Sequence, residues 1–250
     1  MGGSRIIMKV AIFENYNEMS KRAAAIIADC VKEKPDCILG LATGSTPIGL
    51  YSELAAMYAA GTIDFSNVTT FNLDEYYPIK QSDPQSYYYF MQENLFSKIN
   101  VLKEKINIPF GDADDPLIEC QRYHGKINNS NGIDIQVLGI GNNGHIGFNE
   151  PSDNLSLNTH YVALTEDTID ANARFFDSME DVPKHALSMG VGEIMSARKI
   201  LMLISGKGKA QIVKKLFSNQ ISTQVPASLL PLHKDVVVLL DKDAASLLAE

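Results

Sequence analysis

The sequence of 250 residues contains no long apolar run. Its longest apolar stretches, Ile200 to Ile204 and Val236 to Leu240, have strand length, whereas a membrane-spanning helix needs about 18 consecutive apolar residues. We therefore expect no membrane span and no membrane partner.

Cysteine and metal-ligand patterns are also scarce. Cys30, Cys37 and Cys120 are odd in number and lack CxxC spacing, which argues against a disulfide framework and a zinc site and favours a cytosolic protein. The five histidines show no HxH, HxxxH or HExxH spacing, so we predict no metal.

Basic residues are outnumbered, with 22 Lys and Arg against 30 Asp and Glu and a net charge of −8. A basic surface spread over the whole molecule for nucleic acid is thereby excluded. An anionic ligand must be bound by local groups.

Residues 1–7 lack the apolar core of a signal peptide, and Met8-Lys9-Val10 resembles a natural start. We interpret residues 1–7 as a cloning leader and residues 8–250 as one domain, because no linker, repeat or low-complexity tract divides them.

Apolar strands alternate with amphipathic helices along the chain. Buried strands without polar alternation, each followed by a helix, are typical of a parallel sheet covered on both faces. We predict an α/β fold, a single doubly wound Rossmann-like domain with a mainly parallel sheet. The expected strands are Met8 to Phe13, Cys37 to Ala42, Val68 to Leu73, Ile133 to Gly139, Lys199 to Ser205 and Asp235 to Asp241. The expected helices are Glu18 to Lys34, Ile48 to Ala60, Asp83 to Ile99, Pro116 to Asn128, Thr168 to Phe176, Lys207 to Phe217 and Ala244 to Ala249.

Ligands bind beyond the carboxyl ends of the strands in such sheets, and three of these ends are unusual. The first is Thr43-Gly44-Ser45-Thr46-Pro47, whose hydroxyls and free backbone N–H groups suit a phosphate. The same residues also suit an ordinary helix cap. No Lys follows the glycine as in a Walker A loop, so a nucleoside triphosphate is not indicated.

The second strand end is Phe71-Asn72-Leu73-Asp74-Glu75-Tyr76-Tyr77-Pro78. One of its adjacent carboxylates could act as a base, because an apolar cleft raises the pKa of a carboxyl group. A solvated acidic turn is the alternative.

The third end runs from Gly139 to Pro151. Gly139, Gly141 and Gly144 match the dinucleotide-binding pattern GxGxxG, but Pro151 and the polar residues after it interrupt the helix that should follow. The nicotinamide interpretation fails on this context. What remains is a glycine loop presenting His145, with Glu150 near enough to reach the imidazole.

Two cationic segments complete the set. Gly206-Lys207-Gly208-Lys209 follows a predicted strand, and Arg174 lies in Asp170 to Phe176. Such cations are most often solvated. Together with the hydroxyl-rich turn they supply what a phosphomonoester needs in an acidic protein.

The ordered segments LATGSTPIGLY, FNLDEYYP, GIGNNGHIGFNEP, IDANARFF and ISGKGKA resemble the glucosamine-6-phosphate deaminase family from Met8 almost to Glu250. The resemblance implies a Rossmann-like fold and conversion of glucosamine 6-phosphate and water to fructose 6-phosphate and ammonia, with no cofactor and a phosphosugar as the small-molecule partner.

The resemblance also implies residue roles. Asp74 matches the base that moves the C2 proton, His145 the residue that assists ring opening, and Glu150 its carboxylate partner. Asn143 stands where many members have Asp, so one acid of an acid–histidine–acid cluster becomes an amide, which cannot ionise. The residues that match substrate-binding segments are Ala42, Thr43, Gly44, Ser45, Gly139, Arg174 and Lys209.

Two other functions share parts of this pattern. A 6-phosphogluconolactonase would have the same architecture, and a non-catalytic phosphosugar sensor could keep the hydroxyl-rich turn but needs a DNA-binding module. The segment from Ser152 to Asp170 has no Lys or Arg, so we expect a monomer or small homo-oligomer that N-acetylglucosamine 6-phosphate does not activate.

Overall fold

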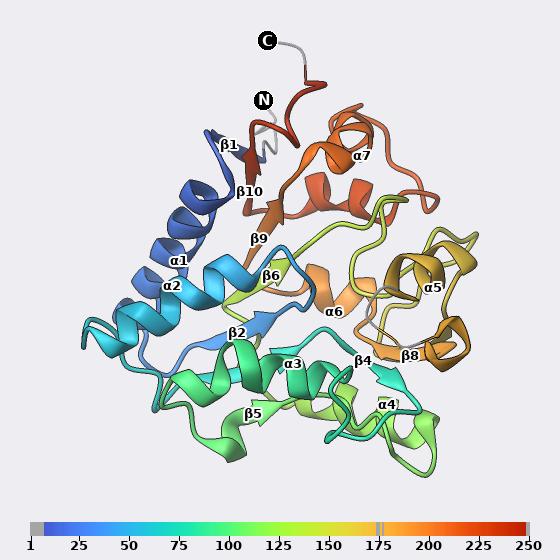
Figure 1. The fold of residues 1–250 in the computed structure, drawn as a ribbon, viewed down its shortest axis with the longest axis horizontal. Coiled ribbons are helices and arrows are strands. Elements are labelled where there is room, and N and C mark those ends of the chain that lie inside the picture. The colour runs from blue at the N-terminus through green and yellow to red at the C-terminus, as the bar shows by residue number, and fades with distance from the viewer. Residues whose placement is uncertain (1–7, 174–175, 177, 249–250) are drawn as a thin grey trace, which may run out of the picture.

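A central sheet of seven strands organises the computed structural model, which describes residues 8–173, 176 and 178–248 (Figure 1). All neighbouring strands pair in parallel, in the order β1-β10-β9-β6-β2-β3-β5. The strands are β1 (Lys9–Phe13), β2 (Ile38–Leu41), β3 (Thr69–Asn72), β5 (Ile106–Asn107), β6 (Ile135–Leu138), β9 (Lys199–Ile204) and β10 (Val236–Asp241). The predicted α/β fold with a mainly parallel sheet is confirmed.

Helices cover the sheet on both sides, with α1 and α2 on one side of β10, β9 and β6 and with α6 and α7 on the other (Figure 1). Strands β2, β6 and β9 are almost entirely buried between them. The helices are α1 (Tyr16–Glu33), α2 (Ile48–Ala59), α3 (Tyr87–Asn94), α4 (Pro116–Asn128), α5 (Glu166–Ala173), α6 (Val191–Met195) and α7 (Ala210–Leu216).

Local chemistry explains where the longer helices begin. The Asn15 side chain accepts the Glu18 N–H at 3.0 Å at the start of α1, and Asp115 accepts the Leu117 N–H at 2.8 Å at the start of α4. These caps satisfy N–H groups that have no partner within the helix. Pro116, which has no N–H to satisfy, occupies the first helical position of α4.

The strand order locates the crevice. The chain crosses from the edge strand β1 to β2 inside the sheet and continues through β3 to β5 at the other edge. It then returns through β6, β9 and β10. The reversal lies between β2 and β6, which is where ligands bind in open α/β sheets. The hydroxyl-rich turn after β2 and the His145 loop after β6 therefore meet at this point.

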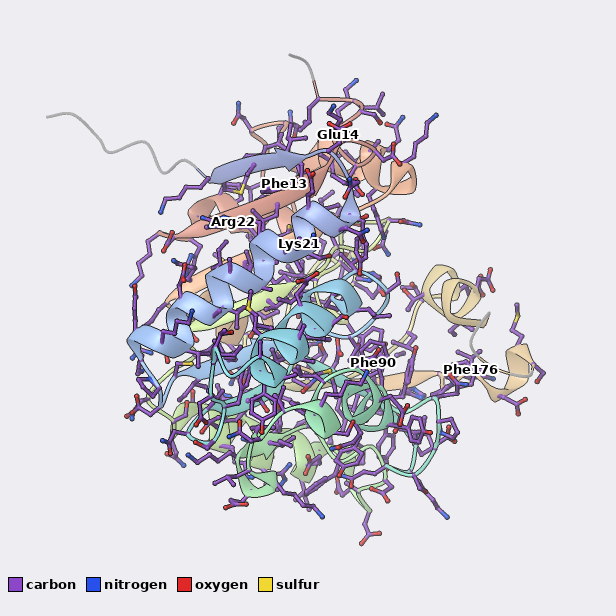
Figure 2. The ribbon with its side chains drawn as sticks, turned by 60° about the vertical axis from the view of Figure 1, so that its left-hand side comes forward. Phe13, Glu14, Lys21, Arg22, Phe90 and Phe176 are labelled. Atoms are coloured by element: carbon purple, nitrogen blue, oxygen red, sulfur yellow. The ribbon has the colours of Figure 1, made fainter. Side chains whose placement is uncertain are left out.

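A second, antiparallel sheet of three strands was not expected. It consists of β4 (Asp74–Tyr77), β8 (His185–Ser188) and β7 (His160–Ala163), in the order β4-β8-β7. Each strand has four residues and pairs with a strand distant in sequence or separated by a long insertion, so local patterns carry little signal of it. In Figure 2, α5 and Phe176 project from the rest of the molecule on the side of this small sheet, whereas Phe90 lies among the elements of the main domain.

Some predicted helix limits are wrong. The helix expected over Ala244 to Ala249 is absent from the described part: residues 242–247 form turns, and the Asp241 carboxylate accepts the Ala244 N–H at 2.8 Å. Helix α3 begins only at Tyr87, where Ser86 caps the Tyr89 N–H at 3.0 Å, and it ends at Asn94.

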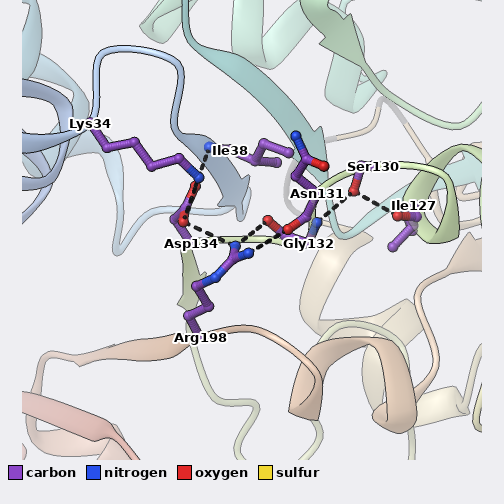
Figure 3. A network of polar contacts seen from close by, with 8 residues as sticks. All are labelled: Lys34, Ile38, Ile127, Ser130, Asn131, Gly132, Asp134 and Arg198. Atoms are coloured by element: carbon purple, nitrogen blue, oxygen red, sulfur yellow. Dashed lines mark hydrogen bonds and ion pairs between the residues drawn. The ribbon is translucent and has the colours of Figure 1, made fainter.

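At the opposite, amino-terminal edge of the sheet, Asp134 joins three strands (Figure 3). Its carboxylate accepts the Ile38 N–H at 2.8 Å and binds Lys34 at 2.9 Å and Arg198 at 3.0 Å. This charged cluster therefore holds the amino-terminal ends of β2, β6 and β9 together. The candidate site lies at the carboxyl ends of the strands.

Among the described residues, no helix is long and apolar enough to cross a membrane. The domain limits at residues 7 and 8 and the cytosolic location stay predictions.

Candidate active site

The hydroxyl-rich turn after β2 is held by a tyrosine from another helix. Tyr16, the first residue of α1, places its hydroxyl 3.1 Å from the Ser45 carbonyl and 3.0 Å from the Thr46 carbonyl, and it accepts the Gly49 N–H at 2.7 Å. Gly44 has φ +93°, which favours glycine. The turn thus has a fixed shape before any ligand binds.

Two further tyrosines flank this turn. The buried Tyr51 hydroxyl donates to the Ala42 carbonyl at 2.5 Å and accepts the Ala42 N–H at 3.2 Å. The Thr43 side chain and the Tyr87 hydroxyl interact electrostatically. Thr43 is therefore connected to α3 as well as to β2.

Asp74 is the first residue of β4 and is 6% exposed. Burial, together with the negative charge of Glu75, raises the pKa of the Asp74 carboxyl to about 8. Its Oδ2 lies 3.6 Å from the position that a Cβ on Gly147 would occupy, beside the His145 loop. A base with this pKa, next to an imidazole loop, can accept and return a proton near neutral pH.

Three glycines shape the His145 loop. A Cβ on Gly141 would lie between 2.3 and 2.5 Å from three atoms of the His145 ring, so only glycine admits the imidazole there. Gly144 and Gly147 have φ of +95° and +55°. The GxGxxG pattern thus serves an imidazole and a tight loop, and no helix follows it, which agrees with rejecting a nicotinamide site.

His145, Asn143 and Glu150 form one polar cluster. The His145 Nδ1 lies 3.2 Å from the Glu150 carboxylate, and the Asn143 amide donates to Glu150 Oε2 at 2.7 Å. The Asn143 oxygen accepts the His145 backbone N–H at 3.1 Å. Asn143 therefore orients both His145 and Glu150, because its amide group carries both a donor and an acceptor.

Thr168, in α5, completes this cluster, and the sequence analysis missed it. Its buried hydroxyl donates to Glu150 Oε1 at 2.5 Å. Burial opposes ionisation of Glu150, but hydrogen bonds from His145, Thr168 and Asn143 outweigh it and lower the pKa of the carboxyl. Eighteen residues separate Thr168 from Glu150, so no local pattern pointed to the contact.

An aromatic cluster lies beside Asp74. Tyr87 stacks on Phe148 with ring centroids 6.1 Å apart, and Tyr76 lies 4.7 Å from Tyr87 and 5.9 Å from Phe176. Tyr76 and Tyr87 interact electrostatically with Asp74, and burial raises the pKa of its carboxyl.

Lys209 ends the short 3-10 helix Lys207–Lys209 after β9. Gly206, with φ +92°, donates its N–H to the Asp241 carboxylate at 3.0 Å, and the Ser205 hydroxyl bonds to the same carboxylate. These contacts fix the turn that carries Lys209. Arg174 lies outside the described residues. Gly139 directly follows β6, and a Cβ there would meet no described atom within 4 Å.

The fold thus brings Asp74, His145, Asn143, Glu150 and the Thr43 turn to one edge of the sheet. Among the described residues, no three His, Cys, Asp or Glu side chains are placed to hold a metal ion.

Comparison with known proteins identifies the family of the chain. Residues 14–239 match the profile of glucosamine-6-phosphate isomerases and 6-phosphogluconolactonases. The chain belongs to this family. A family member from Halothermothrix orenii named glucosamine-6-phosphate deaminase is 57% identical over 241 residues, covering 96% of this chain and 100% of that protein. Another so named, from Thermoanaerobacter pseudethanolicus, is 55% identical over 243 residues, covering 97% and 96%.

Two solved structures extend the comparison. One described as a monomeric glucosamine-6-phosphate deaminase, a "missing link of the NagB superfamily", has a TM-score of 0.94 and 50% identity, covering 96% of this chain and 100% of its own. The structure of a devB protein has a TM-score of 0.82 at 23% identity over 97% of this chain and 100% of its own, and it shows the shared fold alone. The family resemblance and the Rossmann-like fold are confirmed.

Proposed function

We propose that this protein is a glucosamine-6-phosphate deaminase, which converts glucosamine 6-phosphate and water to fructose 6-phosphate and ammonia. The observation that carries the proposal is the buried Asp74 carboxyl, with a pKa of about 8, beside the His145, Asn143 and Glu150 cluster. The relatives that carry this name support it through their identity over nearly the whole chain.

Ring opening is the first step. The pyranose must lose the proton of its C1 hydroxyl and gain one on the ring oxygen. His145 can carry out both transfers, because its side chain is 23% exposed and its Nδ1 is held by the ionised Glu150. Asn143 and Thr168 hold that carboxylate in place.

Isomerisation and deamination follow. Asp74 takes the C2 proton of the open-chain sugar and returns it to C1, which leaves an iminium at C2. Water adds to this carbon, the C–N bond breaks, and ammonia leaves as the C2 ketone forms. The atoms of the sugar phosphate and one water are then accounted for in the two products. The chemistry needs a base whose pKa lies near the working pH, which burial gives Asp74.

The phosphate and hydroxyl groups of the substrate need donors. Thr43, Gly44 and Ser45 offer hydroxyl and backbone N–H groups after β2, while Ala42 and Gly139 form the adjoining strand ends. Lys209 and Arg174 are the proposed phosphate cations. A phosphosugar is the partner, and we propose a monomer, the state given for the structural neighbour.

The test is to incubate the protein with glucosamine 6-phosphate and to measure ammonia and fructose 6-phosphate together. Equal amounts of both products are expected. Asp74→Asn keeps the shape but removes the base, so turnover should fall about 100- to 10,000-fold while substrate affinity stays broadly intact. Unchanged turnover in this variant would refute the role of Asp74.

The same family includes 6-phosphogluconolactonases, so lactone hydrolysis is the alternative activity. Hydrolysis of 6-phosphogluconolactone without ammonia release from the amino sugar would decide for it. Substrate binding without either reaction would point to a phosphosugar-sensing domain.

A further inference from the structure

Glu75 is a buried carboxylate that the proposed mechanism does not use. Glu75 follows the base Asp74 in β4 and is 1% exposed. Burial raises the pKa of the Glu75 carboxyl to about 7, although hydrogen bonds from Tyr87, Tyr88 and Tyr76 oppose this. A buried carboxylate is costly to keep, so its contacts point to its use.

Glu75 holds the start of a helix that belongs to a different part of the chain. Its Oε1 accepts the Tyr87 N–H at 2.8 Å and the Tyr76 N–H at 2.9 Å, and its Oε2 accepts the Tyr88 N–H at 2.9 Å. Tyr87 and Tyr88 are the first two residues of α3, whose N–H groups have no acceptor within the helix. Negative charge at this helix end is also favoured by the helix dipole.

The first residue of α3 reaches the substrate side of the site. The Tyr87 ring stacks on Phe148 of the His145 loop, and its hydroxyl interacts electrostatically with Thr43 of the hydroxyl-rich turn. The first turn of α3 thereby contacts β4, which carries Asp74, and also the turn after β2 and the loop after β6. A displacement of Tyr87 would disturb all three.

We propose that Glu75 is a positioning residue of the site. It anchors the first turn of α3 and thereby holds the Tyr87 side chain in place between the Thr43 turn and the Asp74 base. This role rests on the proposed function and deepens it. Glu75 touches Tyr87 and Tyr88 through their backbone and acts on the substrate only through them.

The charge of Glu75 gives a second readout. Within the part of the chain that the structure describes, Asp74 interacts electrostatically with Glu75 and with the tyrosines Tyr51, Tyr76, Tyr87 and Tyr123, which lie on α2, β4, α3 and α4. Burial raises the pKa of these tyrosines, so they are neutral near pH 8. His145 and Glu150 lie on the adjoining loop, and Asp83 interacts with Glu75.

Two substitutions separate the effect of the Glu75 charge from the effect of its side-chain length. Glu75→Asp keeps the charge but shortens the side chain, so KM should rise about tenfold while the acidic limb of the pH–rate profile stays in place. Glu75→Gln removes the charge and replaces one carboxylate oxygen by an NH₂ group, which cannot accept the N–H that it faces. KM should rise here too, and the acidic limb should move to lower pH, because the pKa of Asp74 falls without a negative neighbour.

Tyr87→Phe tests the same connection from the other end. It removes the hydroxyl that meets Thr43 and should itself raise KM. If Glu75 acts through Tyr87, the double variant Glu75→Asp with Tyr87→Phe should have a KM close to that of the worse single variant. A product of the two fold-changes would overturn the proposal, and this test needs no Glu75→Gln protein.

Glu119→Gln is the matched control. Glu119 is 3% exposed, accepts the Phe110 N–H at 2.8 Å and pairs with Arg122, but it holds α4 instead of α3. This variant should lose thermal stability and keep the wild-type KM and pH profile. If the Glu75 variants behave in the same way, Glu75 is merely structural and the positioning role is wrong.

Failure of the proposed function is a separate result. It would be seen as absence of ammonia release by the wild-type protein itself. Hydrogen exchange of the Tyr87 and Tyr88 amides needs no activity: it should be slow in the wild type and at least about tenfold faster in Glu75→Asp. Equal exchange in both proteins would refute the anchoring of α3.

Discussion

Asp74 and Glu75 are adjacent, similarly buried carboxyls with different hydrogen bonding. Glu75 accepts three backbone N–H groups, whereas no described residue donates a hydrogen bond to the Asp74 carboxylate. The pKa is raised in both, to about 8 for Asp74 and about 7 for Glu75, chiefly by burial. Asp74, which has no donor among the described residues, is the carboxyl that we propose exchanges a proton with the substrate.

The raised pKa of Asp74 predicts a pH-dependent gain in stability on substitution. The pKa of its carboxyl rises from 3.8 to about 8, so the folded state binds this proton more tightly than the unfolded state. Its contribution to stability is therefore lost as the pH rises from about 4 to about 8. Asp74→Asn avoids this loss.

Thermal unfolding of Asp74→Asn and the wild type should accordingly differ little at pH 4. At pH 9 the variant should melt several degrees higher, since each kcal/mol corresponds to about 2 to 4 °C for a domain of this size. A difference in Tm that is the same at both pH values would contradict the raised pKa.

Position 143 tests the tuning of the histidine pair. Asn143→Asp would replace a donor to Glu150 by a second carboxylate at the 2.7 Å contact, and like charges raise the pKa of Glu150. We expect the acidic limb of the pH–rate profile to move upward. Asn143→Ala removes the donor without adding charge, so it should produce a smaller shift. An unmoved limb in Asn143→Asp would mean that ionisation of Glu150 does not limit the reaction.

At the scale of elements, the loop after β6 depends on close packing against its own histidine. Gly141 donates its N–H to the His145 carbonyl at 3.0 Å, and Ala227 donates to the Gly144 carbonyl at 2.9 Å. The Asn149 amide donates to the Met189 carbonyl at 2.8 Å, which ties the loop to the end of β8. The loop is thus a rigid support for the imidazole.

Gly141→Ala should therefore reduce turnover about 10- to 100-fold, because its Cβ would displace the His145 ring. Gly125→Ala in α4 is the matched control, since a Cβ there would meet no described atom within 4 Å. It should keep full activity and gain about 0.5 to 1 kcal/mol in stability. Steady-state rates and thermal melts of both variants check this, and full activity of Gly141→Ala would contradict the packing argument.

At the scale of the molecule, the acidic surface disfavours a second phosphosugar site for activation. The segment from Ser152 to Asp170 contains no Lys or Arg, and an anion there would meet Asp153 and Glu166. Binding a phosphate without a cation is costly. In the structure, this segment also supplies Thr168 to Glu150.

We therefore predict hyperbolic dependence of rate on glucosamine 6-phosphate, unchanged by N-acetylglucosamine 6-phosphate, and a monomer or small oligomer in sedimentation. Sigmoid kinetics that become hyperbolic on adding the acetylated sugar phosphate would show that this expectation is wrong.

Six of the seven strands of the parallel sheet, most of the helices and the motifs of the proposed site could be predicted from the amino-acid sequence alone. Uninterrupted apolar runs and helical spacing are local properties, and Asp74, His145 and Glu150 lie within short motifs. The surroundings that set the pKa values of these groups could not be predicted in this way, because they form only in the folded protein. The small sheet, the Thr168 contact, the anchoring of α3 by Glu75 and the aromatic cluster join residues 11 to over 100 positions apart. The pKa of Asp74 is raised chiefly by burial, which depends on what surrounds the carboxyl in space, while the adjacent Glu75 makes a smaller contribution.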